Sequence, residues 1–179
     1  VIARGKSAIP GVQMDINLQQ PKSVGSIKLS SSDPFDKPII DPNYLSDQRD
    51  IENFTKAFKH LRYITEQDAF KDVLSSEISP GANVKTDDDI HSAIRNLTTT
   101  GHHPVSTCRM GSDNDKSAVL DNKFKVRGTQ NLRVVDASAF PDQINGNINA
   151  AVIMMGEKAA DIILDIPPLK REDPRETTI

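Results

Sequence analysis

The chain of 179 residues has few of the residues that stabilise many small folds: one cysteine, no tryptophan and only 4 % aromatic residues. A single cysteine excludes an internal disulfide. No apolar run approaches the roughly 18–20 residues that a membrane-spanning helix needs, so we expect no membrane segment. None of the nine glycines lies in a GxGxxG pattern, so the chain carries no fingerprint for binding a dinucleotide pyrophosphate.

An excess of positive charge is also missing. The net charge is −3, and basic residues gather no more densely than Lys123, Lys125 and Arg127, so we expect no nucleic-acid partner. The 36 % apolar content predicts a single modest core. Val1 begins the chain without an initiator methionine or the apolar stretch of a signal peptide, and we expect an internal start.

Apolar residues repeat at three- and four-residue spacing in the first half of the chain. This period predicts a helix over 47–66, capped near Ser46 or Asp47, and a second helix after the capping box of residues 86–89. A shorter helix is expected over 68–75. An alternating run predicts a strand over 26–30.

The pattern changes after residue 111. A β-branched run predicts a strand over 131–136, and a strongly apolar run predicts a helix over 150–164. Strand and helix in this order are typical of an α/β unit, whereas the preceding region is mixed. The fold class is therefore predicted as α+β.

Three polar motifs accompany these elements: GHHPVSTCRMG at 101–111, NLRVVDAS at 131–138 and NGNINA at 145–150. Their order and spacing resemble the carboxy-terminal part of the glucose–methanol–choline (GMC) oxidoreductases, which oxidise alcohols with bound FAD. The resemblance runs from about Pro21 to Leu164 and is densest over the last third of the chain.

The resemblance implies a division of the chain. Residues 1–111 would belong to an antiparallel-sheet substrate-binding domain with helices, and residues 112–166 would return to complete an FAD-binding α/β domain. The charged, proline-rich residues 167–179 are expected to form a flexible tail. Because the phosphate-binding glycine loop is missing, the amino-terminal FAD-binding part of the same protein becomes the expected partner.

The resemblance assigns the catalytic base to His103. Flavin-dependent alcohol oxidation needs a group that takes the hydroxyl proton, and histidine side chains titrate near neutral pH. His102 is assigned to packing or to the flavin edge. The alternative is that both are ordinary buried or surface histidines. No metal site is expected, because adjacent side chains do not easily converge on one ion.

Asn147 would occupy the second active-site position of the family. Its amide would donate to the substrate oxygen and steady the developing alkoxide. Helix capping is the alternative, since asparagine is a favoured N-cap and the predicted helix begins nearby. With both residues active, His103 and Asn147 should face one cavity, their side chains roughly 5–8 Å apart.

The flavin contacts implied by the resemblance follow from the same motifs. Asp136 and Ala137 would touch the ribityl–phosphate part of FAD, although a carboxylate that caps the next turn is the alternative. The N-terminus of the 150–164 helix has a partial positive charge and unbonded N–H groups. Backbone groups of Asn147, Ile148 and Asn149 would therefore lie against the isoalloxazine edge that becomes negative on reduction.

The predicted function is FAD-dependent alcohol oxidation, with hydride passing from a carbinol carbon to flavin N5 and a proton to His103. The partners would be a small alcohol substrate and the FAD-binding part of the protein, with neither nucleic acid nor membrane. The chain alone would be inactive. A flavin-containing hydroxynitrile lyase of the same scaffold and a non-catalytic fragment are the alternatives. The sequence leaves open the alcohol, the electron acceptor and the cellular location.

Overall fold

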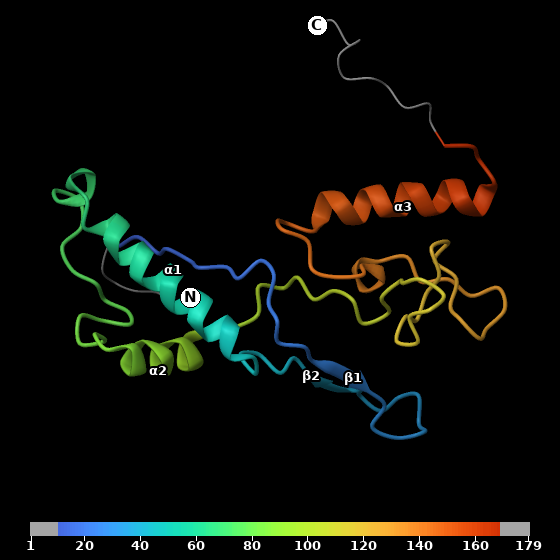
Figure 1. The fold of residues 1–179 in the computed structure, drawn as a ribbon, viewed down its shortest axis with the longest axis horizontal. Coiled ribbons are helices and arrows are strands. Elements are labelled where there is room, and N and C mark those ends of the chain that lie inside the picture. Colours follow the sequence, from blue (N-terminus) through green and yellow to red (C-terminus); the bar gives the residue numbers. More distant parts are fainter. Residues whose placement is uncertain (1–10, 169–179) are drawn as a thin grey trace, which may run out of the picture. The chain divides into compact units, whose positions relative to one another are not determined.

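The computed structural model describes residues 11–168. The chain divides into two compact units, of which the first ends at His102 and the second begins at His103 (Figure 1). Helices combined with a small antiparallel sheet confirm the α+β class. The elements in chain order are β1 (Ser26–Lys28), β2 (Ile39–Asp41), α1 (Gln48–Thr65), the 3₁₀ turn η1 (Asp68–Phe70), α2 (Asp87–Leu97), the 3₁₀ turn η2 (Ala137–Ala139) and α3 (Asn149–Leu164).

The first unit opens with the hairpin of β1 and β2, in which Ile27 pairs with Ile40. The strand predicted over 26–30 is confirmed for its first three residues. All six strand residues are exposed, including the apolar ones. A two-stranded ribbon with no covered face is marginal by itself.

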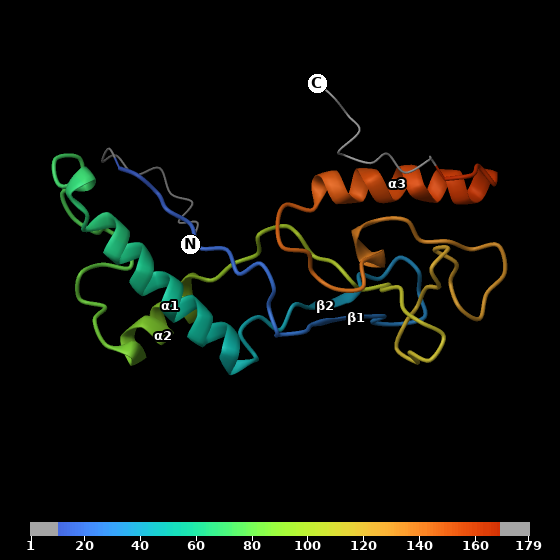
Figure 2. The ribbon, with the colours of Figure 1, turned by 45° about the horizontal axis from the view of Figure 1, so that its top comes forward.

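Helices α1 and α2 pack side by side in the first unit (Figures 1 and 2). Their core comprises Leu45, Ile51, Ile90 and Ile94. Both predicted helices are confirmed, and so is the capping box at the start of α2. The cap of α1 is Asp47, whose pKa is lowered to about 2, chiefly because the Arg49 side chain donates to it.

Asp50 ties the chain before β1 to the first turn of α1. This side chain is buried, and its carboxylate accepts the backbone N–H groups of Lys22 and Ser23, each at 2.8 Å. The Ser23 hydroxyl also donates to Asp50 and in turn accepts the Asp47 N–H at 3.0 Å. A buried carboxylate held by three donors is well compensated for its lost hydration.

Arg62 ties the loop after α1 to the last turn of that helix. Its Nε and Nη2 donate to Glu77 at 2.8 and 2.9 Å, and the guanidinium lies 4.3 Å from the Phe58 ring centre. The same guanidinium donates to the carbonyls of Gly81 and Val84. The helix predicted over 68–75 is shorter than expected, because only η1 forms there.

The second unit is built on α3. Loops of residues 103–148 cover one side of this helix (Figures 1 and 2). The predicted helix 150–164 is confirmed, with one additional residue at its start. The buried core consists of Leu120, Phe124, Ala139, Phe140, Met155 and Ala159.

The regular strand predicted over 131–136 is wrong. This segment pairs at a single position, where Arg133 lies opposite Lys125 in an antiparallel bridge. Phe124 (φ 64°) and Asn131 (φ 57°) have left-handed backbones on either side of that bridge, and such residues interrupt a strand ladder. Beyond the bridge, Val134 and Val135 pack against the core and the chain turns into η2.

The unit boundary after His102 differs from the predicted domain boundary at 111. The assignment of residues 1–111 and 112–166 to functional domains stays a prediction. The predicted tail 167–179 lies outside the described residues beyond Pro168. Between residues 11 and 168, no helix combines the length and apolar character needed to cross a membrane.

Candidate active site

The three polar motifs converge on one core in the second unit. Val105, from the first motif, packs against the same cluster as Val135 from the second and Ile148 from the third. His103 and Asp136 lie within two residues of Val105 and Val135, and Asn147 directly precedes Ile148. The fold therefore brings these three candidate residues into one compact unit.

A short run of backbone hydrogen bonds joins the first two motifs directly. The N–H of Ser106 donates to the carbonyl of Ala137 at 3.3 Å. Cys108 N–H donates to the Ser138 carbonyl at 2.9 Å, and Met110 N–H donates to the Ala139 carbonyl at 3.1 Å. The loop that follows His103 is therefore aligned along η2, next to Asp136.

The histidine pair straddles the boundary between the two units. His103 is half-buried and begins the second unit. His102 is exposed, ends the first unit and has a left-handed backbone with φ 60°, while its N–H donates to Thr100 Oγ1 at 3.0 Å. The catalytic role of His103 and the flavin-edge role of His102 stay predictions.

Asp136 caps the turn that follows it, which is the alternative role expected from the sequence. Its Oδ1 accepts the backbone N–H of Ser138 at 2.8 Å and also the Ser138 hydroxyl, which caps η2. Within the described residues, the second carboxylate oxygen, Oδ2, accepts no hydrogen bond. One oxygen thus orients the carboxylate, and the exposed Oδ2 can accept a hydroxyl of a ligand.

Asn147 also combines a local contact with an unused group. Its Oδ1 accepts the N–H of Asn149 at 2.9 Å, an Asx turn at the start of α3. Gly146 precedes it with φ 150°, a conformation that favours glycine. Because the carboxamide oxygen is engaged, the Nδ2 group is left as the outward donor, and it has no partner among residues 11–168.

The N-terminus of α3 has few partners of its own. Its N-cap, Ile148, makes no side-chain cap, and the first turn contains no acidic residue. In the described part of the chain the N–H groups of Ala150 and Ala151 have no hydrogen-bond partner. Such N–H groups, with the helix dipole behind them, suit a carbonyl or an anionic ring edge.

These groups fit the flavin that the sequence implied. The Asp136 carboxylate supplies an oriented acceptor for a polyol hydroxyl, and the start of α3 supplies donors for a ring that gains negative charge. Both lie in the second unit and rest on the same core. The donor and acceptor types are those that a ribityl chain and an isoalloxazine edge require.

Two further residues of the site, Ser138 and Ser106, were not predicted from the sequence. Ser138 orients Asp136, and the Asp-x-Ser spacing typical of Asx turns was the available signal. Ser106 has a left-handed backbone with φ 69°, and its buried Oγ has no partner within the described residues. No local pattern in the sequence indicates that conformation.

Comparison with known proteins places this geometry in a family. A family profile described as GMC oxidoreductase matches residues 21–156. The chain is 42 % identical over 161 residues to human mitochondrial choline dehydrogenase, covering 90 % of this chain and 27 % of that protein. It is 43 % identical over 159 residues to the oxygen-dependent choline dehydrogenase of Vibrio vulnificus, covering 89 % and 28 %.

A solved structure agrees with these sequence matches. The crystal structure of pyridoxine 4-oxidase from Mesorbium loti superposes with a TM-score of 0.73 and 37 % identity, covering 79 % of this chain and 27 % of that one. The chain thus spans about a quarter of the length of the relatives that it matches. The chain belongs to the GMC oxidoreductases, a family of flavoproteins that bind FAD.

Proposed function

We propose that this chain supplies the base-carrying, carboxy-terminal part of an FAD-dependent enzyme that oxidises an alcohol. The observation that carries the proposal is the convergence of three motifs on one core, with the His103 loop hydrogen-bonded to the turn after Asp136. Choline and pyridoxine, after which these two relatives are named, are both alcohols. The substrate class proposed for this protein is a small alcohol.

His103 is the group that takes the hydroxyl proton in this proposal. A half-buried imidazole beside a proline-restricted backbone is a suitable proton acceptor. Asn147 Nδ2 donates to the substrate oxygen, because Asn149 N–H holds the other end of the carboxamide. Together they stabilise the alkoxide, one by accepting a proton and the other by donating a hydrogen bond.

The cofactor would be held from two directions. Asp136 Oδ2 and the backbone of Ala137 contact the ribityl–phosphate part, and the start of α3, with residues 147–149, contacts the ring edge. His102 lies at the flavin edge or packs beside it. When bound, FAD supplies the hydride acceptor, and the chain's own residues supply the proton acceptor and the hydrogen bonds.

Unpartnered apolar surface supports a further part of the proposal, the amino-terminal FAD-binding region. On α3, Met154 is 61 % exposed and Leu164 is 67 % exposed. Exposed apolar residues, interspersed with the charged Glu157 and Lys158, indicate that another part of the complete protein covers a portion of this side of α3. The exposed hairpin residues Ile27, Ile39 and Ile40 also require a neighbour.

The test uses the full-length protein that contains this chain. His103→Ala should lower alcohol oxidation a hundredfold or more, the usual scale for a positioned acid–base group, while the bound FAD content stays near normal. His60→Ala, at an exposed histidine of α1, is the control and should leave the rate unchanged. An unaltered rate in His103→Ala would remove this residue from the mechanism.

Anaerobic mixing with candidate alcohols separates the reaction classes. An oxidase or dehydrogenase loses its flavin absorbance near 450 nm as the flavin is reduced, whereas a hydroxynitrile lyase retains it. The 179-residue chain alone should bind no FAD stably, since it has no glycine-rich phosphate loop. A yellow and active preparation of this chain would contradict the proposed division of labour.

A further inference from the structure

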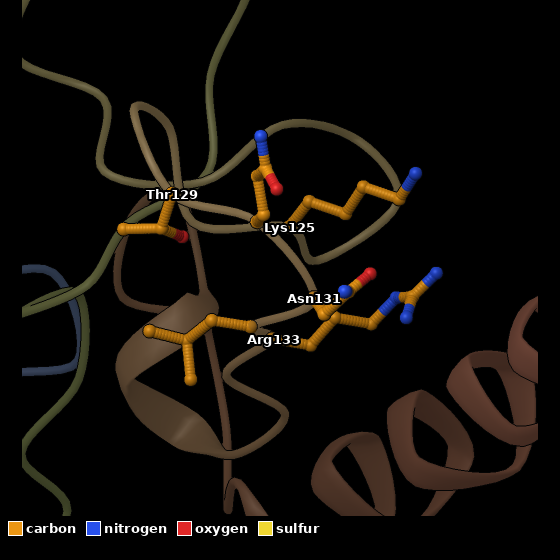
Figure 3. A pocket seen from close by; sticks show the side chains of 6 residues that line it. Lys125, Thr129, Asn131 and Arg133 are labelled. Atoms are coloured by element: carbon orange, nitrogen blue, oxygen red, sulfur yellow. The ribbon is translucent and has the colours of Figure 1, made fainter.

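A polar pocket, apart from the candidate active site, lies in the second unit at the turn that follows Phe124. It has a volume of about 330 Å³ and is lined by Lys125, Thr129, Gln130, Asn131, Leu132 and Arg133 (Figure 3). None of these residues belongs to the proposed catalytic or flavin-binding set. Five of the six lining residues have a polar side chain with a hydrogen-bond donor, and none is a carboxylate.

The two cations of this pocket are placed directly opposite each other. Lys125 and Arg133 form an antiparallel bridge. The flanking bonds, Val126 N–H to the Leu132 carbonyl at 3.0 Å and Val134 N–H to the Phe124 carbonyl at 3.1 Å, make it a non-hydrogen-bonded pair. Side chains in such pairs approach most closely, and like charges placed there are destabilising.

No carboxylate of residues 11–168 forms an ion pair with either cation. Asp121 Oδ1 accepts the backbone N–H groups of Lys123 at 2.8 Å and Lys125 at 2.9 Å, and its carboxylate attracts the Lys125 side chain only from beyond ion-pair distance. Arg133 Nε donates to the Lys123 carbonyl at 3.3 Å, which anchors the guanidinium and leaves its terminal nitrogens available.

The neutral side chains of the pocket also donate hydrogen bonds, so the pocket as a whole suits an anion. Figure 3 shows the side chains of Lys125, Asn131 and Arg133 extending to the same side of the turn. Asn131 has φ 57°, and this left-handed backbone belongs to the turn between the two cations. An ammonium, a planar guanidinium fork and an amide together match a compact oxyanion.

We propose that this pocket binds a small phosphomonoester, with the phosphate between Lys125 and Arg133 and the organic part towards Leu132 and Thr129. A dianion compensates both cations at once, which a monocarboxylate does not. The pocket volume of about 330 Å³ leaves room for a small organic portion beside the phosphate group. This site is separate from the proposed reaction and does not depend on it.

The test is calorimetric titration of the purified protein, with its bound flavin retained, using glycerol 3-phosphate, inorganic phosphate and succinate at constant ionic strength. We expect saturable binding at one site, with glycerol 3-phosphate tightest. Arg133→Gln and Lys125→Gln should each weaken binding tenfold or more, as the loss of one charge-assisted hydrogen bond does. Lys123→Gln is the matched control, because this lysine lies in the same turn but outside the lining, and it should change affinity less than twofold.

Three outcomes would overturn the proposal: no saturable binding of glycerol 3-phosphate at about 10 mM, tighter binding of succinate, or equal losses in Lys123→Gln and Arg133→Gln. The last result would indicate non-specific attraction to a basic turn. Lys125 is exposed, so Lys125→Gln keeps the test valid if Arg133→Gln does not fold. The flavin absorbance of each variant should stay unchanged, which separates this site from the cofactor site.

Discussion

Ser106→Gly is expected to stabilise this protein, although it deletes a side chain from the motif that carries His103. Ser106 has φ 69°, a conformation that costs a non-glycine residue about 1–2 kcal/mol. Its Oγ is buried without a partner in the described part of the chain, and a buried polar group without a hydrogen bond costs about 1–3 kcal/mol. Both costs disappear in glycine.

A third contribution opposes these two. Glycine gains freedom in the unfolded chain, which lowers the free energy of unfolding by about 0.5–1 kcal/mol. The net increase should therefore be about 1–4.5 kcal/mol. The backbone bond from residue 106 to the Ala137 carbonyl involves no side-chain atom and is retained.

Ser106→Ala separates the cost of the unpaired hydroxyl from the cost of the left-handed backbone. Alanine removes the hydroxyl but keeps the left-handed strain, so its free energy of unfolding should lie between those of the parent and the glycine variant. Guanidinium denaturation of the full-length protein, monitored by circular dichroism, measures all three. The reasoning is refuted if glycine is no more stable than alanine. Destabilisation by Ser106→Ala would show that Oγ has a partner outside the described residues.

The remaining predictions concern the contacts that organise each unit. Asp50→Asn should lower the free energy of unfolding by about 2–4 kcal/mol, because the charged acceptor of three donors is lost and the amide N–H₂ must face the backbone N–H of either Lys22 or Ser23; a denaturation midpoint equal to that of the parent would contradict this. The pKa of Glu77 is lowered from its usual 4.5, first by the Arg62 side chain that donates to it, so the stabilisation from this pair is complete above about pH 4.5 and is lost as pH falls through the lower folded value. Glu77→Gln should therefore flatten the fall in thermal stability at pH below about 4.5, measured against the parent over a pH series. Asp136→Ala should weaken FAD retention about tenfold or more, measured by flavin release on dilution, whereas Ser138→Ala should weaken it less, because the Ser138 N–H still holds the carboxylate. Asp142→Ala, at an exposed carboxylate nearby, is the control and should retain FAD normally.

The helices were predictable because each carries its own local signals. The apolar stripe of α1, its Asp47 cap and the Thr86–Asp89 capping box of α2 are all properties of neighbouring residues. The strand predicted over 131–136 failed, because a β-branched run indicates only that the backbone is extended, not that it pairs. Pairing depends on what lies beside it, and left-handed Phe124 and Asn131 restrict it to one bridge.

In the candidate site, too, local motifs were readable from the sequence, whereas contacts between distant residues were not. The motifs named His103, Asp136 and Asn147, and the structure adds that their flanking residues share one core. The distance between His103 and Asn147 side chains stays a prediction. The Arg62–Glu77 pair spans 15 positions, and no periodicity in the sequence indicates a contact of that kind. The contact of Ser138 with Asp136 could have been predicted from the sequence, since the hydrogen bond joins residues only two positions apart.

The run of backbone hydrogen bonds between residues 106–110 and 137–139 determines which substitutions this protein can accept there. Its three bonds join main-chain atoms only, so the alignment is encoded by chain conformation and not by the identity of the side chains along it. The exposed side chain at 107 can therefore be exchanged while this alignment is kept, whereas Arg109 is tied by its side chain to Asp115 and Ser117. Proline at 106, 108 or 110 is the exception, because it removes the donor itself.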